Sequence, residues 1–338
     1  AGVVPGMAGI GRIGVVGAGL IGGSIAKAAA EFSPADVVVA DAGASTRAAL
    51  GARGFRVVGD AAAVATAVDV AFVAVPPAAT AGVVAEMLRA SDTVVVSDTA
   101  SVKRAVWEGV AALAPPGALP RYVPGHPLAG RESHGWENST ADLVRGAVWA
   151  VCPDAERTDA AATITVMAAI TAMQARVLAI GADDHDSALA YTSHMPHLGA
   201  SALTRTVAHD SPAQRFRLSG GSLRDATRVA AASSQLWGDI LRQNGPNIVT
   251  ALDDFIAELR DYRDMVADER WDDLAAAWRE GAAAREHLRT ARWSDERPVE
   301  DLSYPRTVGA LLDLGRDGRL IHSVADAGAE VEVCVSRP

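Results

Sequence analysis

The sequence of 338 residues predicts an α/β domain with a parallel sheet, followed by an all-helical domain and a short β-like C-terminal extension. Valine-rich runs alternate with helical segments as far as Cys152, and long Ala-rich amphipathic segments follow Pro153. A β-like pattern returns near residue 298. We therefore expect an N-terminal arm, an α/β domain, a helical domain and an extension at residues 1–11, 12–153, 154–293 and 294–338.

The composition is that of a globular protein, with 49% hydrophobic and 21% charged residues. A net charge of -10 argues against nucleic acid or an anionic membrane surface as the main partner, because an acidic face repels both. The two cysteines, Cys152 and Cys334, are far apart and lack metal-ligand spacing, so we expect neither a disulfide framework nor a metal site. No signal-like N-terminal segment or apolar run of 18 residues occurs, which favours a cytoplasmic location.

The first strand, over residues 12–17, leads into a glycine-rich turn and a helix over 23–31. Gly17 suits the tight turn, Gly19 lets backbone approach a pyrophosphate, and Gly22 permits close packing of the helix on the strand. The phosphate is expected at the helix N-terminus. Strand, glycines and helix in this order predict a Rossmann-type dinucleotide-binding domain.

A second buried strand, over residues 36–41, ends in Asp41. This acid lies at about the spacing at which a carboxylate binds the ribose of NAD, so Asp41 favours NAD over NADP. The alternative is a glycine-rich turn in another kind of α/β protein, but the strand with a terminal acid disfavours it.

Further strands are predicted over residues 68–76, 93–98 and 146–152, with helices over 78–90 and up to Leu113. Runs of valine without polar alternation are typical of a parallel sheet that is buried on both faces. Ligands of such sheets collect at the carboxyl ends of the strands. The predicted cofactor-binding residues are Gly17, Gly19, Leu20, Ile21, Gly22, Asp41, Pro76, Asp98 and Thr99.

His126 lies between Gly125 and Pro127, after a short apolar strand that stops at Pro124. The backbone has left that strand and cannot begin a helix, so we expect the imidazole to point into a cleft. The alternative for a single histidine is that it only satisfies local hydrogen bonds.

The second half of the chain reads as helices over residues 155–172, 182–208, 222–243, 246–268 and 270–292, with a short strand over 175–180. His194 and His197 are three residues apart, but Pro196 disturbs their helix and disfavours a metal site. Arg224 and Arg228 are one helical turn apart and suit a substrate carboxylate. Solvated arginines paired with neighbouring aspartates are the alternative.

From about Ile13 to Arg292, the sequence resembles the prephenate and arogenate dehydrogenases of tyrosine biosynthesis. The resemblance rests on the motifs Gly17-Ala-Gly-Leu-Ile-Gly-Gly-Ser24, Ser97-Asp-Thr-Ala-Ser-Val-Lys103, Gly125-His-Pro-Leu-Ala-Gly130, Ser193-His-Met-Pro-His197 and Arg224-Asp-Ala-Thr-Arg-Val-Ala230, then Trp237 and Asp239. It implies an NAD(P)-dependent oxidative decarboxylation, in which a ring carbon loses hydride, the ring carboxylate leaves as carbon dioxide and the ring becomes aromatic. It also implies a homodimer formed through the helical domain.

The resemblance implies roles for individual residues. His126 is expected to hydrogen-bond the ring hydroxyl and take its proton, which suits an imidazole because its ordinary pKa lies near neutral pH. Ser101 is expected to contact both that histidine and the cofactor side, and His194 to be structural. The residues expected at the substrate are Arg228 on a carboxylate, His197, Trp237 at the pocket or the subunit interface, and Glu132 with Arg224 at a polar gate.

Some features depart from the family pattern. Arg131 stands where a small residue is commoner, and residues 233–235 replace a proline-containing turn. The C-terminal segment is too short for a complete regulatory ACT domain, so we do not expect feedback control by tyrosine through one. The substrate is left open between prephenate, arogenate and the 4-amino-4-deoxyprephenate of antibiotic pathways.

Two other functions remain as alternatives. A hydroxyacid dehydrogenase or imine reductase has the same architecture, but such hydroxyacid enzymes use a lysine in the helical half, and here Lys27 and Lys103 are the only lysines. A catalytically silent NAD sensor would bind the cofactor whether or not His126 is present.

Overall fold

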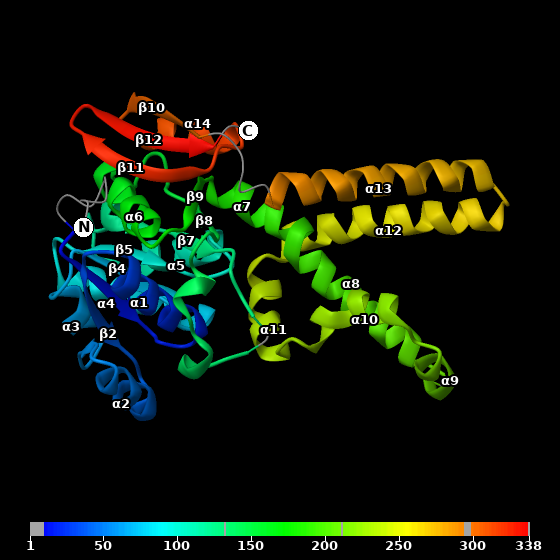
Figure 1. Cartoon of the computed structure of the whole chain (residues 1–338), viewed down its shortest axis with the longest axis horizontal. Helices are drawn as coiled ribbons and strands as arrows, with labels where there is room; N and C mark the ends of the chain where they lie inside the picture. Colours follow the sequence, from blue (N-terminus) through cyan, green and yellow to red (C-terminus); the bar gives the residue numbers. More distant parts are fainter. Residues whose placement is uncertain (1–9, 132, 211, 294–298, 337–338) are drawn as a thin grey trace. The chain divides into compact units, whose positions relative to one another are not determined.

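The computed structural model describes residues 10–131, 133–210, 212–293 and 299–336 (Figure 1). Glu132, which we predicted at the polar gate, lies outside these residues. The chain divides into two compact units. Unit 1 comprises Ala1–Asp186, Ala232–Gln243 and Val299–Pro338, and unit 2 comprises Ser187–Ala231 and Asn244–Pro298.

The units differ from the domains that we expected from the sequence. We placed the end of the α/β domain at residue 153, where the valine-rich pattern gives way to helical segments. Unit 1 instead continues to Asp186, and the segments 232–243 and 299–338 return to it. A change of periodicity marks a change of secondary structure, whereas membership of a unit depends on the core in which each element packs.

Unit 1 contains a six-stranded sheet with the order β3-β2-β1-β4-β5-β6, in which all neighbours pair in parallel. Its strands are β1 (Arg12–Val16), β2 (Asp36–Ala40), β3 (Arg56–Val57), β4 (Val70–Val73), β5 (Val95–Asp98) and β6 (Tyr122–Val123). The strands predicted over 12–17, 36–41, 68–76 and 93–98 are thus confirmed. The strand order reverses between β1 and β4, which is where doubly wound sheets bind nucleotides.

Helices cover both faces of this sheet. They are α1 (Leu20–Phe32), α2 (Ala44–Ala52), α3 (Ala61–Ala65), α4 (Pro77–Ala90), α5 (Arg104–Leu113) and α6 (Ala160–Ala172). Helices α1 and α6 share one core with Ile13 and Val15 of β1, while α3, α4 and α5 share another with Val16. Consecutive side chains of a strand point to opposite faces, so the unbroken valine runs supply both cores.

A second six-stranded sheet in unit 1 has the order β10-β12-β11-β9-β8-β7. Its strands are β7 (Gly125–Pro127), β8 (Val148–Val151), β9 (Arg176–Ala179), β10 (Val299–Pro305), β11 (Ile321–Ala327) and β12 (Glu330–Ser336). We predicted residues 146–152 as the last strand of the parallel sheet, which was wrong: β8 pairs with β7 and β9. Its apolar run indicated burial but could not indicate the partner strand.

The C-terminal extension forms β10, β11 and β12 with one helix, α14 (Val308–Arg316), and its β-like pattern is confirmed. Strand β11 joins the extension to β9 through an antiparallel pair of Ile321 and Val177. A Cβ on Gly315 would lie 1.6 Å from the carbonyl oxygen of Ala179, so α14 can pack on β9 only with glycine at that position.

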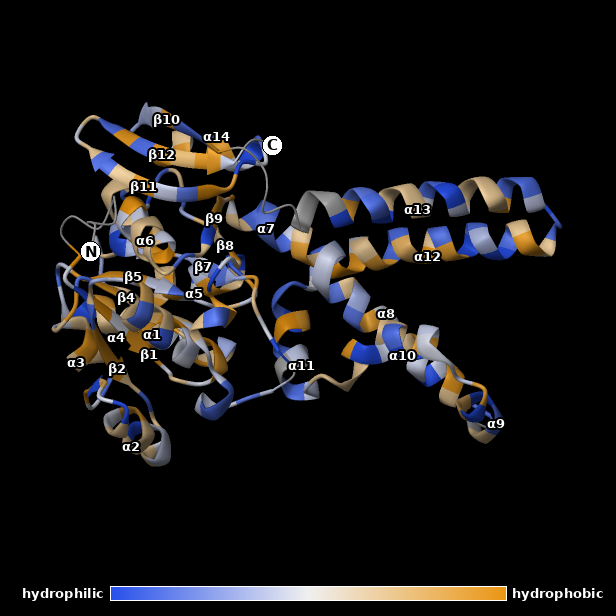
Figure 2. Cartoon of the chain, in the orientation of Figure 1, coloured by the Kyte–Doolittle hydropathy of each residue, from blue (hydrophilic) through white to orange (hydrophobic). Residues whose placement is uncertain are grey.

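Unit 2 is helical. Its elements are the π-helical turn η4 (Ala190–His194), α8 (Met195–Ala208), α9 (Pro212–Arg217), α10 (Gly221–Thr227), the 3-10 turn η5 (Arg228–Ala231), α12 (Gly245–Ala267) and α13 (Trp271–Trp293). Helices α12 and α13 lie side by side as a hairpin (Figure 1), which confirms the helices predicted over 246–268 and 270–292. Their hydropathy alternates along the chain, whereas the parallel strands of unit 1 are mostly apolar (Figure 2).

Two helices that we predicted as continuous are interrupted. The segment 182–208 forms α7 (Ala182–Leu189), the π turn and α8, because Pro196 lacks the N–H that an unbroken helix needs there. The segment 222–243 forms α10, η5 and α11 (Ser234–Gln243), and α11 packs against α4 within unit 1. Three further 3-10 turns lie in unit 1: η1 (Leu119–Arg121), η2 (Trp136–Asn138) and η3 (Ala141–Leu143). Among the described residues, no helix combines the length and apolar composition needed to span a bilayer.

Candidate functional site

The glycine-rich turn joins β1 to α1. Gly17 has a φ of +87°, a conformation that glycine adopts without strain. A Cβ on Gly22 would lie 1.8 Å from the carbonyl oxygen of Gly17, so this close approach of helix and turn also requires glycine. Gly19 faces open space, and α1 begins after it without a side-chain cap. The backbone N–H groups at this helix end therefore suit a phosphate, as we predicted for the segment that includes Leu20 and Ile21.

Asp41 follows β2 and is held against the glycine-rich turn. Its Oδ2 accepts the backbone N–H of Ala18 at 2.7 Å, and its Oδ1 accepts that of Gly43 at 2.7 Å. The neighbouring Arg47 guanidinium donates to the backbone carbonyl of Asp41 at 2.9 Å. A carboxylate fixed at this position can accept hydroxyl groups of a ribose.

Pro76, Thr99 and Ser101 lie beyond the carboxyl ends of β4 and β5. Pro76 occupies the N-cap position of α4, and Thr99 donates from its hydroxyl to the carbonyl of Val73 at 3.4 Å. Ser101 is half-buried in the turn that leads to α5. All three therefore lie at the same edge of the sheet as the glycine-rich turn, which is the edge at which we predicted the ligand.

Asp98 ends β5, and we predicted that it contacts the cofactor. The structure instead buries its side chain completely. Its Oδ1 accepts Lys103 Nζ at 2.6 Å, and its Oδ2 accepts the Tyr122 hydroxyl at 2.7 Å. Burial and the adjacent carboxylate raise the pKa of Tyr122, so the phenol keeps its proton and donates it. The carboxylate of Asp98 thus stabilises the protein interior rather than facing a ligand.

Lys103 links this buried pair to the strand that carries His126. Its Nζ is fully buried and donates to the carbonyl of Gly125 at 2.5 Å. Asp98 Oδ2 also accepts the backbone N–H of Gly125 at 3.4 Å. One ion pair therefore holds both polar backbone groups of the residue before His126.

His126 lies in β7, opposite Ala150 of β8. We predicted that its backbone has left the strand, and Pro124 does end β6, but a new short strand begins at Gly125. The residue is 9% exposed. Its Nδ1 lies 2.9 Å from Nε2 of His185, so the imidazole is anchored on that side by a second histidine.

His185 and Asp186 lie in α7, on the part that belongs to unit 1. His185 Nδ1 lies 2.8 Å from Oδ1 of Asp186. Burial lowers the pKa of His185 although the Asp186 carboxylate opposes this shift. Burial alone would raise the pKa of Asp186, but hydrogen bonds from His185 and from two backbone N–H groups outweigh it and lower that pKa. A neutral imidazole therefore donates to an ionised carboxylate.

The two histidines of the Ser193–His197 motif lie in unit 2. His194 is buried, and its Nδ1 accepts from the Asn244 side chain at 3.1 Å, which agrees with the structural role implied for it. His197 is half-buried on α8 and donates from Nδ1 to the carbonyl of Ser193 at 2.8 Å. No cluster of three or more His, Cys, Asp or Glu side chains suited to a metal ion occurs among the described residues.

The predicted arginines are exposed in unit 2. Arg224 lies in the last turn of α10, and Arg228 opens the 3-10 turn η5 rather than continuing the helix. Both elements pack against α8, which carries His197. Trp237 is half-buried on α11 and belongs to unit 1, as His126 does. The predicted substrate residues thus come from both units.

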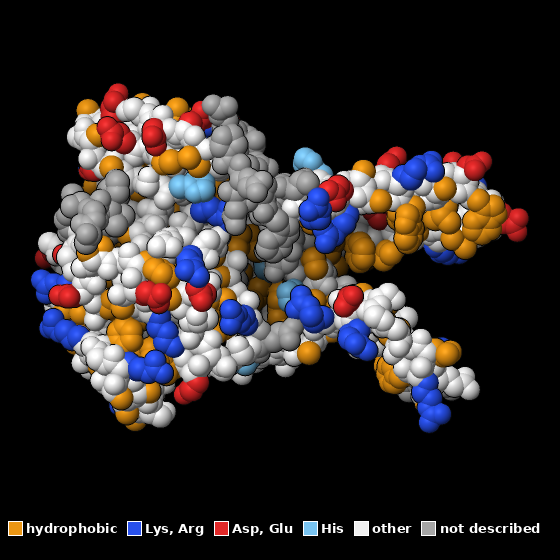
Figure 3. Space-filling model, in the orientation of Figure 1, with side chains coloured by type: hydrophobic (Ala, Val, Ile, Leu, Met, Phe, Trp, Pro, Cys, Tyr) orange, Lys and Arg blue, Asp and Glu red, His pale blue; other side chains and the backbone are white. Residues whose placement is uncertain are grey.

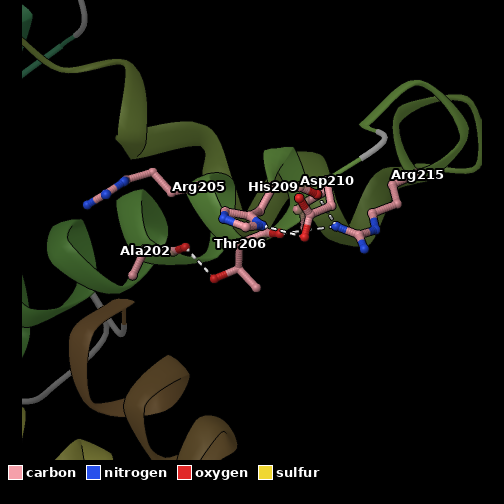
Figure 4. Close-up of a pocket in the computed structure, with 7 residues that line it drawn as sticks. Ala202, Arg205, Thr206, His209, Asp210 and Arg215 are labelled. Atoms are coloured by element: carbon pink, nitrogen blue, oxygen red, sulfur yellow. Dashed lines mark hydrogen bonds and ion pairs between the residues drawn. The ribbon is translucent and has the colours of Figure 1, made fainter.

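A hollow on the surface of unit 2 has a lining that includes none of the predicted site residues (Figure 4). Its lining consists of Ala202, Arg205, Thr206, Val207, His209, Asp210 and Arg215. Arg215 donates to the backbone carbonyls of Thr206 and His209, and His209 pairs with Asp210. Arg215, His209 and Asp210 thus have partners within the lining of the hollow.

Family models and relatives agree with this architecture. The model described as the prephenate dehydrogenase nucleotide-binding domain matches residues 35–179, and the model of the dimerization domain matches residues 181–280. Cyclohexadienyl dehydrogenase of Zymomonas mobilis is 35% identical over 289 residues, which span 82% of this chain and 96% of that relative. The chain belongs to the prephenate dehydrogenase family.

A further relative agrees with this assignment, and a solved structure shares the fold. Prephenate dehydrogenase of Bacillus subtilis is 27% identical over 275 residues, which span 77% of this chain and 71% of that relative. The fold is shared with the crystal structure of prephenate dehydrogenase from A. aeolicus in complex with hydroxyphenyl propionate and NAD+, at a TM-score of 0.75 and 24% identity, covering 82% of this chain and 98% of that one. As a member of the prephenate dehydrogenase family, the chain is an oxidoreductase for cyclohexadienyl substrates.

Proposed function

We propose that this protein catalyses the NAD-dependent oxidative decarboxylation of prephenate or arogenate, with His126 as the proton acceptor. The observation that carries this proposal is the anchored imidazole of His126 in β7, which follows the carboxyl end of β6 in the parallel sheet that also presents the glycine-rich turn. Lys103 and Asp98 hold the backbone of Gly125, the residue before it, and His185 holds its ring. Such an orientation is what a general base requires, because efficient proton transfer depends on a fixed geometry.

The reaction separates one hydride and one proton from the ring carbinol. NAD, when bound, supplies the hydride acceptor. His126 takes the hydroxyl proton as the carbon–oxygen double bond forms. The ring carboxylate then leaves as carbon dioxide, its bonding electron pair passes into the ring, and a phenolate results. Return of the proton from His126 to that oxygen gives the phenol, so the base is restored and atoms and charge balance.

Preference for NAD is part of the proposal and rests on Asp41. The site fits the cofactor, because Gly19 leaves the backbone open and α1 has no side-chain cap. The Asp41 carboxylate would accept the ribose hydroxyls and repel the 2′-phosphate of NADP. Thr99, Ser101 and Pro76 would border the nicotinamide side of the same edge.

Arg228 is proposed to bind a substrate carboxylate, with His197, Arg224, Trp237 and Glu132 as further substrate residues. A guanidinium binds a carboxylate through two parallel hydrogen bonds, which a lysine ammonium cannot do. This part of the proposal rests on the sequence motif and on the exposure of Arg228 in unit 2.

A homodimer is proposed through unit 2. Large apolar side chains are exposed along α12 and α13, where Figure 3 shows apolar atoms gathered along the hairpin. They are Val249, Ile256, Leu259, Val266, Trp271, Trp278 and Leu288. A contiguous apolar surface of this kind is typical of protein–protein contacts, and the matching family model is a dimerization domain.

The test is to incubate the protein with NAD and, separately, prephenate, arogenate or 4-amino-4-deoxyprephenate, while following the absorbance of the reduced nicotinamide. We expect turnover with prephenate or arogenate, and a turnover confined to the amino compound would move the protein to that substrate. Reduction of NAD with none of the three would refute the proposal and leave a cofactor-binding sensor.

Two variants assign the roles. His126→Asn is expected to lower kcat by about 100- to 10,000-fold, with NAD binding unchanged. Arg228→Ala is expected chiefly to raise the substrate KM, while Arg205→Ala, a change of another exposed arginine in unit 2, should leave it unaltered. An unchanged KM in Arg228→Ala would remove that residue from the site.

A further inference from the structure

Three side chains in unit 1 form a buried chain of hydrogen bonds that begins at His126. Nδ1 of His126 lies 2.9 Å from Nε2 of His185, and Nδ1 of His185 lies 2.8 Å from Oδ1 of Asp186. His185 and Asp186 are 1% and 2% exposed, so water competes for neither bond. The two imidazole rings meet edge to face at a centroid distance of 5.2 Å.

Asp186 determines which ring nitrogen of each histidine carries the hydrogen in this chain of hydrogen bonds. Its Oδ1 accepts the backbone N–H of Lys103 at 2.8 Å, and its Oδ2 accepts that of Arg104 at 2.9 Å. These bonds at the start of α5 hold the carboxylate in its ionised form. An ionised carboxylate only accepts hydrogen bonds, so Nδ1 of His185 must carry the hydrogen.

The protonation of His126 follows from this direction. A neutral His185 with its hydrogen on Nδ1 presents a lone pair at Nε2. That lone pair can only accept, so Nδ1 of His126 is the donor across the 2.9 Å contact. Neutral His126 then carries its single hydrogen on Nδ1 and a lone pair on Nε2, which is the form that can take a proton from a substrate hydroxyl.

We propose that His185 and Asp186 are positioning residues, which fix the tautomer and ring orientation of His126 and stabilise its imidazolium. This inference rests on the proposed function of His126. Proton transfer puts a positive charge on His126, and the lone pair of His185, backed by the Asp186 carboxylate, lies directly against that charge. The arrangement resembles the logic of a Ser-His-Asp triad, in which a buried acid orients the base.

His185 and Asp186 could also serve only to stabilise the fold, and the choice of variant distinguishes that role from the positioning of His126. Asp186 also accepts the backbone N–H groups of Lys103, the N-cap of α5, and of Arg104, its first residue, so changing Asp186 would disturb that helix as well. His185 is the cleaner target. His185→Gln keeps a side-chain oxygen that can accept from His126, whereas His185→Phe keeps the bulk of the ring and removes the acceptor.

The tautomer is measured directly by nitrogen-15 NMR of the full-length protein with labelled histidine, without any substrate. His126→Asn identifies the signals of His126 among the eight histidines. We expect His126 to be protonated at Nδ1 in the wild type and in His185→Gln, and to shift towards protonation at Nε2 in His185→Phe. His209→Gln removes an exposed histidine and should leave these signals unchanged. A wild-type His126 protonated at Nε2 would overturn the inference.

Kinetics supply the second readout. We expect kcat to fall about 10- to 100-fold in His185→Phe and to recover largely in His185→Gln, with the KM for NAD unaltered. The acid limb of the kcat/KM profile should move to lower pH in His185→Phe. The imidazolium of His126 loses its hydrogen bond to His185 there, so His126 is protonated only at lower pH. The other ionisable groups around this chain, Asp98, Lys103, Tyr122 and Cys152, are the same in both variants.

If kcat fell equally in His185→Phe and His185→Gln, or if the acid limb of kcat/KM did not move in His185→Phe, His185 would have only a structural role. The two readouts also separate this inference from the proposed function. A protein that turned over none of the substrates would fail the proposed function, while the tautomer of His126 would still decide whether His185 and Asp186 orient it.

Discussion

Lys103 shows at the scale of one residue how a buried charge supports the site. Its ammonium is completely buried between the Asp98 carboxylate and the Gly125 carbonyl. Removing one member of a buried ion pair leaves the other charge without compensation, which is costly. The pair therefore ties the geometry of the His126 strand to the stability of the parallel sheet.

Lys103 and Lys27 are the only two lysines in the chain, and only Lys103 is fully buried. Lys103→Met should lower the free energy of unfolding by about 3–5 kcal/mol, because the Asp98 carboxylate is left buried without its cation. Lys27→Met should cost only about 1 kcal/mol, since Lys27 is partly exposed and its Nζ donates to the carbonyl of Ser139. Urea denaturation measures both, and similar losses in the two variants would contradict the assigned role of Lys103.

The negative charge of Asp41 is expected to set the preference for NAD over NADP. Asp41→Asn keeps one side-chain oxygen for the Ala18 backbone and removes the negative charge. The ratio of kcat/KM for NAD to that for NADP should fall about tenfold or more, equivalent to 1.4 kcal/mol. Asp36→Asn, a change of an exposed acid at the start of β2, serves as the control. An unchanged ratio in Asp41→Asn would remove Asp41 from the choice of cofactor.

The turn between β1 and α1 is the element proposed to bind the phosphates of the cofactor. Its glycines are required for different reasons, since a Cβ on Gly22 meets the Gly17 carbonyl at 1.8 Å whereas a Cβ on Gly19 meets nothing within 4 Å. The same glycine-to-alanine change should therefore affect different properties at the two positions: stability at Gly22 and cofactor binding at Gly19.

Gly22→Ala should lower the free energy of unfolding by about 1–3 kcal/mol, because α1 must shift away from the turn. Gly19→Ala should change it by less than about 0.5 kcal/mol, since its φ of -70° suits any residue. Gly19→Ala should nevertheless weaken NAD binding, because the added methyl group projects from the backbone that the pyrophosphate approaches. Thermal unfolding and calorimetric titration with NAD test both effects. Gly19→Ala with unaltered affinity would contradict this account.

Elements whose sequence signal is local could be predicted, and those that depend on distant partners could not. The valine runs of β1, β2, β4 and β5 indicated burial, and the glycine spacing with Asp41 indicated a nucleotide site. The same kind of run at residues 148–151 did not reveal that β8 joins another sheet. Helices α2 and α3 were not predicted, because their short Ala-rich segments show little periodicity.

The site follows the same division. The role proposed for His126 comes from its neighbours in sequence and from the family motif. Its partner His185 is 59 residues away, and Lys103 is 22 residues from the carbonyl it binds, so neither contact has a signal in local spacing. Only the folded chain shows that His185 and Asp186 lie behind the imidazole of His126.

The apolar face of the α12–α13 hairpin bears on how the whole molecule associates with a second copy. Trp271 and Trp278 are 56% and 71% exposed, and Leu259 and Val266 on α12 are also about half exposed. Leaving such side chains in water is unfavourable, so a second copy of the chain that covers them would gain stability from their burial. A specific dimer interface needs about 1,200–2,000 Å² of buried surface, which is reached when both partners contribute the same face.

Trp278→Glu tests this dimer. Tryptophans often contribute most of the binding energy at interfaces, and a buried carboxylate without a partner opposes association. We expect the wild type to sediment as a dimer and Trp278→Glu as a monomer in analytical ultracentrifugation. Leu113→Glu changes a 52% exposed leucine on α5 of unit 1 and should leave the dimer intact. A dimeric Trp278→Glu, or a monomeric Leu113→Glu, would place the interface elsewhere. Because a twofold interface contains each substituted residue twice, one substitution introduces two charges, so a single variant is a sensitive test.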